Sequence, residues 1–91
     1  MSENIDEKLA KYRELTQRAL EKVSVIEGNE KKANELLEMA KSYYSDAQHF
    51  EKEGKKLTAL AAYSYAHAWI DAGVRLRILD GRDDDQLFVL P

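Results

Sequence analysis

The sequence predicts an all-α protein, an antiparallel up-down-up three-helix bundle that forms one domain over residues 1–91. Three observations favour this fold. Apolar residues recur every three or four positions along most of the chain, only four glycines and one proline interrupt them, and 34% of the residues are charged. Because a chain of this length has room for one hydrophobic core, all its helices must share that core.

The first predicted helix covers residues 5–27. Asn4 is the expected N-cap, since its side chain can accept a hydrogen bond from the next turn, and Gly28 is the expected C-cap. Between these residues the apolar stripe has helical spacing: Ile5, Leu9, Tyr12, Thr16, Ala19, Val23 and Ile26.

The second predicted helix covers residues 29–53 and ends before Gly54. One of its faces is apolar and the opposite face carries Lys, Glu, Asp and Gln. The connections on both sides of this helix are short, so successive helices must run antiparallel. The apolar face consists of Ala33, Leu36, Leu37, Ala40, Tyr43, Tyr44, Ala47 and Phe50.

The third predicted helix, residues 57–79, is more apolar, with sixteen apolar residues among 23. A helix of this composition needs burial on two flanks. One flank holds Leu60, Tyr63, Ile70, Val74 and Ile78, and the other holds Ala61, Tyr65, Trp69, Ala72, Leu76 and Leu79. The strip of small residues between the flanks would allow close approach of another segment: Ala59, Ala62, Ala66 and Gly73.

The C-terminal tail, residues 82–91, contains the apolar run Leu87–Leu90. We expect this tail to pack back on the third helix. The alternative is that a second protein molecule covers the exposed flank, because large apolar patches are uncommon on monomers. The acidic run Asp83–Asp85 lacks the alternating ligands of a calcium-binding loop and is interpreted as a solvated hinge.

Charge and composition limit the classes of function that the chain can have. Lys and Arg total 14 against 17 Asp and Glu, which gives a net charge of −3, so nucleic-acid binding is disfavoured. The chain has no cysteine, which fits a reducing compartment, and we expect a cytoplasmic location. No secretory signal pattern and no membrane-spanning apolar run is found, so no contact with a membrane is expected.

One polar strip on the third helix is a candidate site. Ser64, His67, Asp71 and Arg75 recur at helical spacing, which permits a small-ligand or catalytic site. A straight helix offers no oxyanion hole, so this row is not a protease triad. We favour the interpretation as a solvated strip with an Asp71–Arg75 ion pair. As further interface candidates we consider Tyr63, Trp69 and Phe88.

Other chemistries find less support. Asp46 and His49 form a second carboxylate–histidine pair, but His49 belongs to the polar face of its helix, and we expect no metal site. The glycines are too dispersed for a phosphate-binding loop, and we expect no cofactor. A nucleic-acid contact would have to use Lys55, Lys56, Arg75, Arg77 and Arg82.

The segment Tyr44–Phe88 carries a resemblance. Its marks are the strings Tyr44-Ser45-Asp46-Ala47-Gln48-His49-Phe50 and Tyr65-Ala66-His67-Ala68-Trp69-Ile70-Asp71-Ala72-Gly73. With these strings the chain resembles the archaeal domain of unknown function 357 family. The resemblance implies a short helical bundle of archaeal, cytoplasmic origin, in a family with no established activity.

No catalytic residue is assigned from the sequence, and the function stays unknown at this level. The leading hypothesis is a non-enzymatic helical interaction or assembly module that binds an unidentified protein partner or associates with itself. Its basis is the two-flanked third helix and the apolar tail. The alternatives are the His67 and Asp71 strip as a small-ligand or catalytic site and weak nucleic-acid binding.

Overall fold

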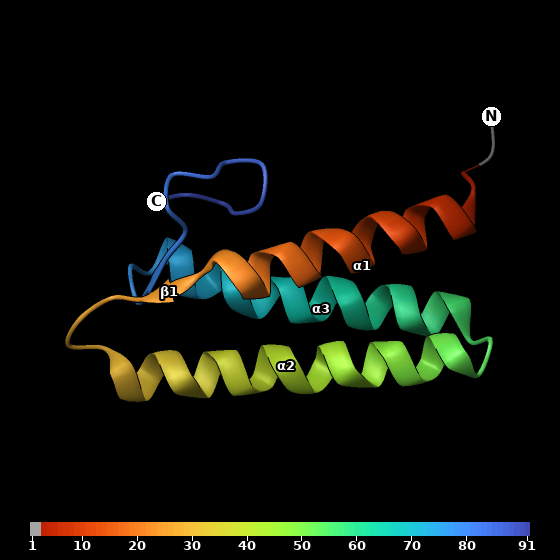
Figure 1. Cartoon of the computed structure of the whole chain (residues 1–91), viewed down its shortest axis with the longest axis horizontal. Helices are drawn as coiled ribbons and strands as arrows, with labels where there is room; N and C mark the ends of the chain where they lie inside the picture. The colour runs from red at the N-terminus through yellow and green to blue at the C-terminus, as the bar shows by residue number, and fades with distance from the viewer. Residues whose placement is uncertain (1–2) are drawn as a thin grey trace.

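The computed structural model describes residues 3–91 and confirms the three-helix bundle (Figure 1). The helices are α1 (Ile5–Lys22), α2 (Glu30–Lys52) and α3 (Lys56–Arg75). Two short strands, β1 (Ser24–Val25) and β2 (Leu79–Asp80), pair antiparallel beyond the ends of α1 and α3. Successive helices run in opposite directions, as the short connections predicted.

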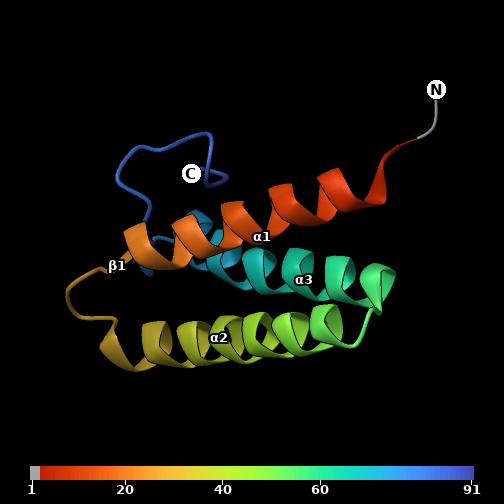
Figure 2. The same ribbon diagram turned by 45° about the vertical axis from the view of Figure 1, so that its right-hand side comes forward.

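Helix α3 is the centre of the molecule. It packs against both α1 and α2, whereas α1 and α2 contact each other little, and α3 lies between them in two views (Figures 1 and 2). This position explains its composition, because a helix covered from two directions needs more apolar surface than its neighbours.

Small residues let α2 and α3 pack closely. Ala33, Ala40 and Ala47 recur every seven residues on α2, and all three are fully buried. Ala59, Ala66 and Gly73 recur at the same interval on α3 and are also buried. A Cβ on Gly73 would lie 2.5 Å from Cδ1 of Leu79, so this position has no room for a side chain. The predicted close approach of another segment to α3 is confirmed.

Helix α1 ends earlier than predicted. The sequence predicted residues 5–27, but the helix stops at Lys22 and Val23 is already extended, with φ −63° and ψ 142°. Three of the four residues 23–26 are β-branched and favour extended backbone, and β1 gains a pairing partner in β2. Gly28 therefore lies in the following turn and does not cap the helix. The predicted N-cap is confirmed, since Asn4 Oδ1 accepts the Glu7 N–H at 3.1 Å.

Helix α3 also ends earlier, at Arg75 instead of residue 79. The Ile78 N–H donates to the Gly73 carbonyl at 2.9 Å and the Arg77 N–H to the Val74 carbonyl at 3.1 Å. This pair of bonds is a Schellman motif, in which one residue takes left-handed backbone; here it is Arg77, with φ 60°. Glycine is usual at that position, so the sequence carried no signal for this end.

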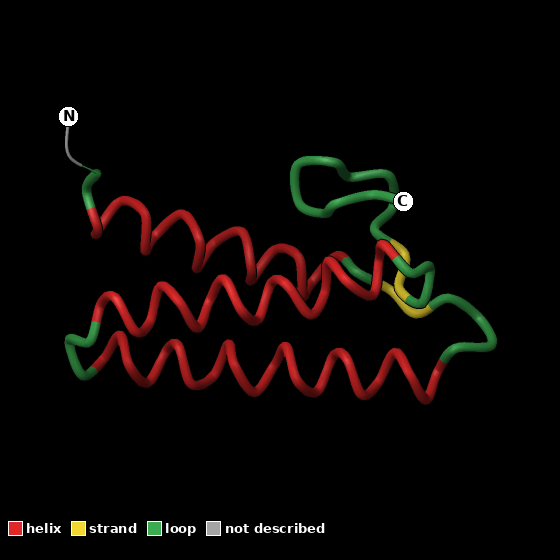
Figure 3. The backbone as a smooth tube through the Cα atoms, turned by 180° about the vertical axis from the view of Figure 1, so that it is seen from behind, coloured by secondary structure: helices red, strands yellow, loops and turns green. Residues whose placement is uncertain are grey.

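The tail packs back on the helices of the same chain, as expected. Leu87 and Phe88 are each 4% exposed and join the core cluster of Ile70, Val74 and Leu79. Seen from behind, the tail forms a loop beside the strand pair (Figure 3).

The prediction that residues 83–85 form a solvated hinge is wrong for Asp84. Its carboxylate accepts a hydrogen bond from Nζ of Lys22 at 2.8 Å and from the N–H groups of Gln86 and Leu87 at 3.1 Å. The acidic run therefore helps to hold the tail. Within residues 3–91, no helix combines the length and the apolar character that crossing a membrane requires.

Candidate functional site

The polar strip of α3 contacts the tail. His67, Asp71 and Arg75 follow one another at intervals of four residues, and each hydrogen-bonds the tail backbone. His67 Nε2 lies 2.5 Å from the Leu87 carbonyl, Asp71 Oδ1 accepts the Val89 N–H at 3.1 Å, and Arg75 Nη1 donates to the Leu90 carbonyl at 2.7 Å. We call His67, Asp71 and Arg75 the tail clasp.

The protonation of His67 follows from its partner. A carbonyl oxygen only accepts, so Nε2 of His67 carries a proton. On the other side of the ring, Nδ1 lies 3.4 Å from Oγ1 of Thr16, a fully buried residue of α1 whose hydroxyl donates to the Tyr63 carbonyl. The imidazole therefore bridges α1 and the tail.

The tail partly covers the predicted Ser64-His67-Asp71 row, and a hollow of about 260 Å³ remains beside His67 and Asp71. The side chains of His67 and Asp71 are only 14% and 28% exposed, while Ser64 is exposed and stands outside the tail contact. The expectation of a solvated strip is therefore wrong for His67 and Asp71. The guanidinium of Arg75 bonds the tail backbone, which takes the place of the expected ion pair with Asp71.

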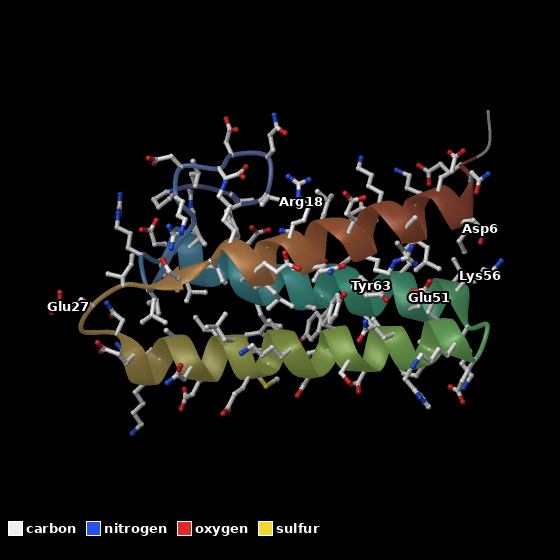
Figure 4. All side chains as sticks on the ribbon, in the orientation of Figure 1. Asp6, Arg18, Glu27, Glu51, Lys56 and Tyr63 are labelled. Atoms are coloured by element: carbon white, nitrogen blue, oxygen red, sulfur yellow. The ribbon has the colours of Figure 1, made fainter. Side chains whose placement is uncertain are left out.

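The side chain of Tyr63 is part of the core and links two helices. It is fully buried, and its hydroxyl donates to Glu51 at 2.8 Å, while Arg13 pairs with the same carboxylate (Figure 4). Burial, and then the hydrogen bond to Glu51, raise the pKa of the Tyr63 phenol well above its ordinary value of 10. The phenol stays neutral and joins α2 to α3.

Trp69 lies in an apolar groove between α2 and α3, with a volume of about 490 Å³. Three charged residues of α2 form one rim of this groove: Lys32, Glu35 and Glu38. Its apolar lining comes from α2, α3 and the segment after α3. We call the following five residues the apolar groove: Leu36, Met39, Trp69, Leu76 and Ile78.

The apolar groove is open to solvent. Leu76 is 68% exposed, and Met39 is 37% exposed. The prediction that the whole second flank of the third helix is buried is therefore wrong, although Leu79 of that flank is buried beyond the helix end. The flank stays exposed because α2 covers the small-residue strip and the tail packs elsewhere. Tyr65, 49% exposed, extends the patch by contacting Trp69 edge to face at 6.0 Å.

Trp69 also has a polar atom without a partner. Its Nε1 is buried, and no acceptor among the described residues reaches it. Buried N–H groups normally have a hydrogen-bond partner, so this indole N–H is an unsatisfied donor beneath the apolar groove.

Sequence reasoning missed part of this surface. Leu36 was assigned to the core and Met39 was not assigned, although the two side chains, with Tyr43, follow at intervals of three and four residues along α2. That second stripe, displaced from the Ala33–Ala40 line, was the available signal. The bond from Lys22 to Asp84 had no comparable signal, because it joins distant parts of the chain.

The basic residues considered for nucleic acid do not gather. Lys55 and Lys56 lie at the N-terminal end of α3 and pair with Glu53 and Asp6, the latter at 2.8 Å (Figure 4). The three arginines lie at or beyond the opposite end, about 30 Å away along a helix of twenty residues: Arg75, Arg77 and Arg82.

The second carboxylate–histidine pair is also separate. His49 is exposed and lies 3.5 Å from Glu53 on its own α2. Over residues 3–91, no three His, Cys, Asp or Glu side chains converge in a way that could hold a metal ion.

Comparisons with known proteins identify the family. Neither the curated proteins nor the solved structures gave a match. A family model described as "Protein of unknown function (DUF357)" matches residues 11–79. This range contains most of α1, all of α2 and α3, the tail clasp and the lining of the apolar groove. With more than half of its length matched, the chain belongs to the DUF357 family.

Proposed function

We propose that this protein is a non-enzymatic interaction module whose apolar groove receives an amphipathic helix of a partner protein. The observation that supports the proposal is the open groove itself, which stays uncovered although the chain has an apolar tail. Contiguous exposed apolar surface is typical of interaction sites. We expect the interaction in the cytoplasm, since a cysteine-free chain suits a reducing compartment.

The groove favours a helix over an extended segment. An extended segment needs partners for its own N–H and C=O groups, as the tail shows on the other side of α3. The lining of the apolar groove supplies one buried donor, the Trp69 indole. A helix satisfies its backbone internally and needs only an apolar surface.

The chemistry of the groove specifies the helix further. Glu35 and Glu38 outnumber Lys32 on the α2 rim, so a basic residue at the edge of the partner's apolar stripe is favoured.

The alternatives receive no comparable support. Each member of the tail clasp is already hydrogen-bonded to the tail, and the tail itself lines much of the small hollow beside His67 and Asp71, which favours the apolar groove as the binding surface. The basic residues lie at two ends of α3, which does not favour a continuous nucleic-acid surface.

The test compares two leucine variants of the full chain in a nuclease-treated native extract. Leu76→Glu places a charge in the apolar groove, whereas Leu57→Glu changes a leucine that is 72% exposed at the far end of α3. We expect wild type and Leu57→Glu to retain the same protein and Leu76→Glu to lose it.

A helical peptide from the retained protein should then shift the emission of Trp69, the only tryptophan in the chain. Retention that Leu76→Glu leaves intact, retention of no protein, or a peptide that leaves the emission unchanged would contradict the proposal. Retention that nuclease treatment removes would favour nucleic-acid binding instead.

A further inference from the structure

The tail occupies its position as a peptide ligand occupies a binding site. Three side chains of α3, spaced four residues apart, contact successive backbone groups of Leu87, Val89 and Leu90. They supply a donor at His67, an acceptor at Asp71 and a donor at Arg75. The tail, which turns between Asp84 and Phe88 through a 3.0 Å bond from the Phe88 N–H to the Asp84 carbonyl, is thus recognised through its backbone.

Apolar contacts provide the side-chain selectivity. Phe88 packs over Gly81, where an added Cβ would lie 2.8 Å from the ring, and shares a core cluster with Val74. The N–H groups of Gln86 and Leu87 bond the Asp84 carboxylate, which pairs with Lys22 of α1. The site therefore selects an acidic residue with apolar residues three and four positions after it.

A strained turn joins this segment to the rest of the chain. The Asp84 N–H donates to the Gly81 carbonyl at 3.1 Å, which closes a tight reversal over Arg82 and Asp83. Both residues have left-handed backbone, with φ 54° and 59°. That conformation suits glycine or asparagine at this kind of turn and is unfavourable for arginine.

We propose that the site formed by the tail clasp, together with Val74 and Gly81 around Phe88, also binds in trans. Its ligand is residues 84–91 of a second copy of this chain. A second copy carries the identical segment, so each tail contact described above can form between two chains. Opening the turn at Arg82 and Asp83 releases the left-handed backbone and exchanges the two tails reciprocally.

Protein concentration decides whether the tail binds its own chain, in a closed form, or a second copy, in an exchanged form. A short connection gives the tail an effective concentration on the order of mM at its own site, so the wild-type chain exchanges only near that concentration. Any change that disfavours the turn while leaving the tail intact lowers the concentration needed.

The experiment uses two matched double variants of the full chain. Arg82→Val with Asp83→Val disfavours left-handed backbone at both positions, whereas Arg82→Asn with Asp83→Gly is the preferred sequence for such a turn. Both variants lose the Arg82 bond to the Lys22 carbonyl, so this loss cancels in the comparison. At about 0.1 mM protein, a concentration below the estimated mM range, sedimentation equilibrium should show a dimer for the valine variant and a monomer for the other.

Additional substitutions in the valine variant locate the interface. Asp71→Ala removes one hydrogen bond at each of the two exchanged sites, so relative to a monomer with an open tail it should weaken the dimer about a hundredfold. Leu76→Glu should leave the dimer unchanged. A monomeric valine variant with its tail docked, or a dimer that responds to Leu76→Glu and not to Asp71→Ala, would overturn the proposal. Neither result bears on the partner helix proposed for the apolar groove.

A second measurement tests the proposal on the wild-type chain, in case the valine variant fails to fold. A labelled peptide of residues 83–91 is titrated to mM concentration onto the wild-type chain, beside the same peptide with Phe88→Ala. Binding of the intact peptide alone supports the site in trans. Equal binding of both peptides, or binding of neither, would overturn it.

Discussion

The two sides of α3 differ in how their apolar surface is covered. Both sides present apolar surface that the neighbouring helix leaves uncovered. On the side toward α1, residues 87–90 close the surface, and Leu87 and Phe88 are buried. On the side toward α2, the apolar groove stays open, with Leu76 and Met39 exposed.

The difference lies in polar side chains. The α1 side carries the tail clasp, which provides partners for the backbone of an extended segment. The groove side provides the Trp69 indole and a charged rim. Because backbone groups must keep hydrogen-bond partners when they are covered, an irregular tail can close only the first side. The second side suits a segment with an internally bonded backbone.

The largest expected effect compares one large apolar residue from each side. Phe88→Ala should lower the free energy of unfolding by about 3 kcal/mol, because it removes a buried ring and leaves a cavity. Leu76→Ala should change it by less than about 0.5 kcal/mol, because that side chain is already in solvent. Urea unfolding followed by circular dichroism measures both values. Similar losses for the two variants would mean that the sides do not differ in stability.

An intermediate effect tests the clasp. Asp71→Ala should cost about 1 kcal/mol, at the low end for a hydrogen bond to a charged group, because Asp71 is partly exposed. Ser64→Ala, on the same strip but outside the tail contact, should change stability by less than about 0.5 kcal/mol. Faster amide exchange at Val89 in Asp71→Ala alone is the accompanying signature. Unchanged exchange at Val89 would show that the clasp does not hold the tail.

The smallest expected effect is a response to acid on one side only. The hydrogen bond from Lys22, supported by the N–H groups of Leu87 and Gln86, holds the pKa of Asp84 below its ordinary value. The ionised form is therefore favoured in the folded state. This contribution is present above the unfolded pKa of about 4 and is lost as pH falls through the lower folded pKa.

Acidification from pH 5 should thus loosen the tail before it affects the groove. Resonances of Leu87 should shift first, while Trp69 emission stays constant. Asp84→Asn should weaken the tail at pH 7 and reduce its acid response, and Asp83→Asn, at an exposed position, should do neither. Simultaneous changes at Leu87 and Trp69 would indicate that the two sides respond as one unit.

Several features could be predicted from local sequence. The three helices, the Asn4 cap, the short connections and the return of the tail all follow from apolar spacing, capping residues and surface economy. Two helix ends could not be predicted in this way. The end of α1 depends on the pairing of β1 with the distant β2, in which Ser24 lies opposite Asp80 and Val25 opposite Leu79. The end of α3 relies on left-handed backbone at Arg77.

The candidate surfaces show the same division. The spacing of His67, Asp71 and Arg75 placed them on one strip of one helix, because helical periodicity is a local property. Their partners are backbone groups of residues 87–90, and no spacing rule connects those two segments.

By itself the sequence determined that the chain forms three amphipathic helices around one core and that α3 has more apolar surface than two neighbours can cover. Only the tertiary structure decided which part of that surface the tail closes. The physical reason is that burial of apolar surface has no direction, whereas hydrogen bonds to a covering backbone require donors and acceptors at fixed positions. Beside α1 the tail clasp supplies those positions, whereas the groove has its charged groups along the α2 rim.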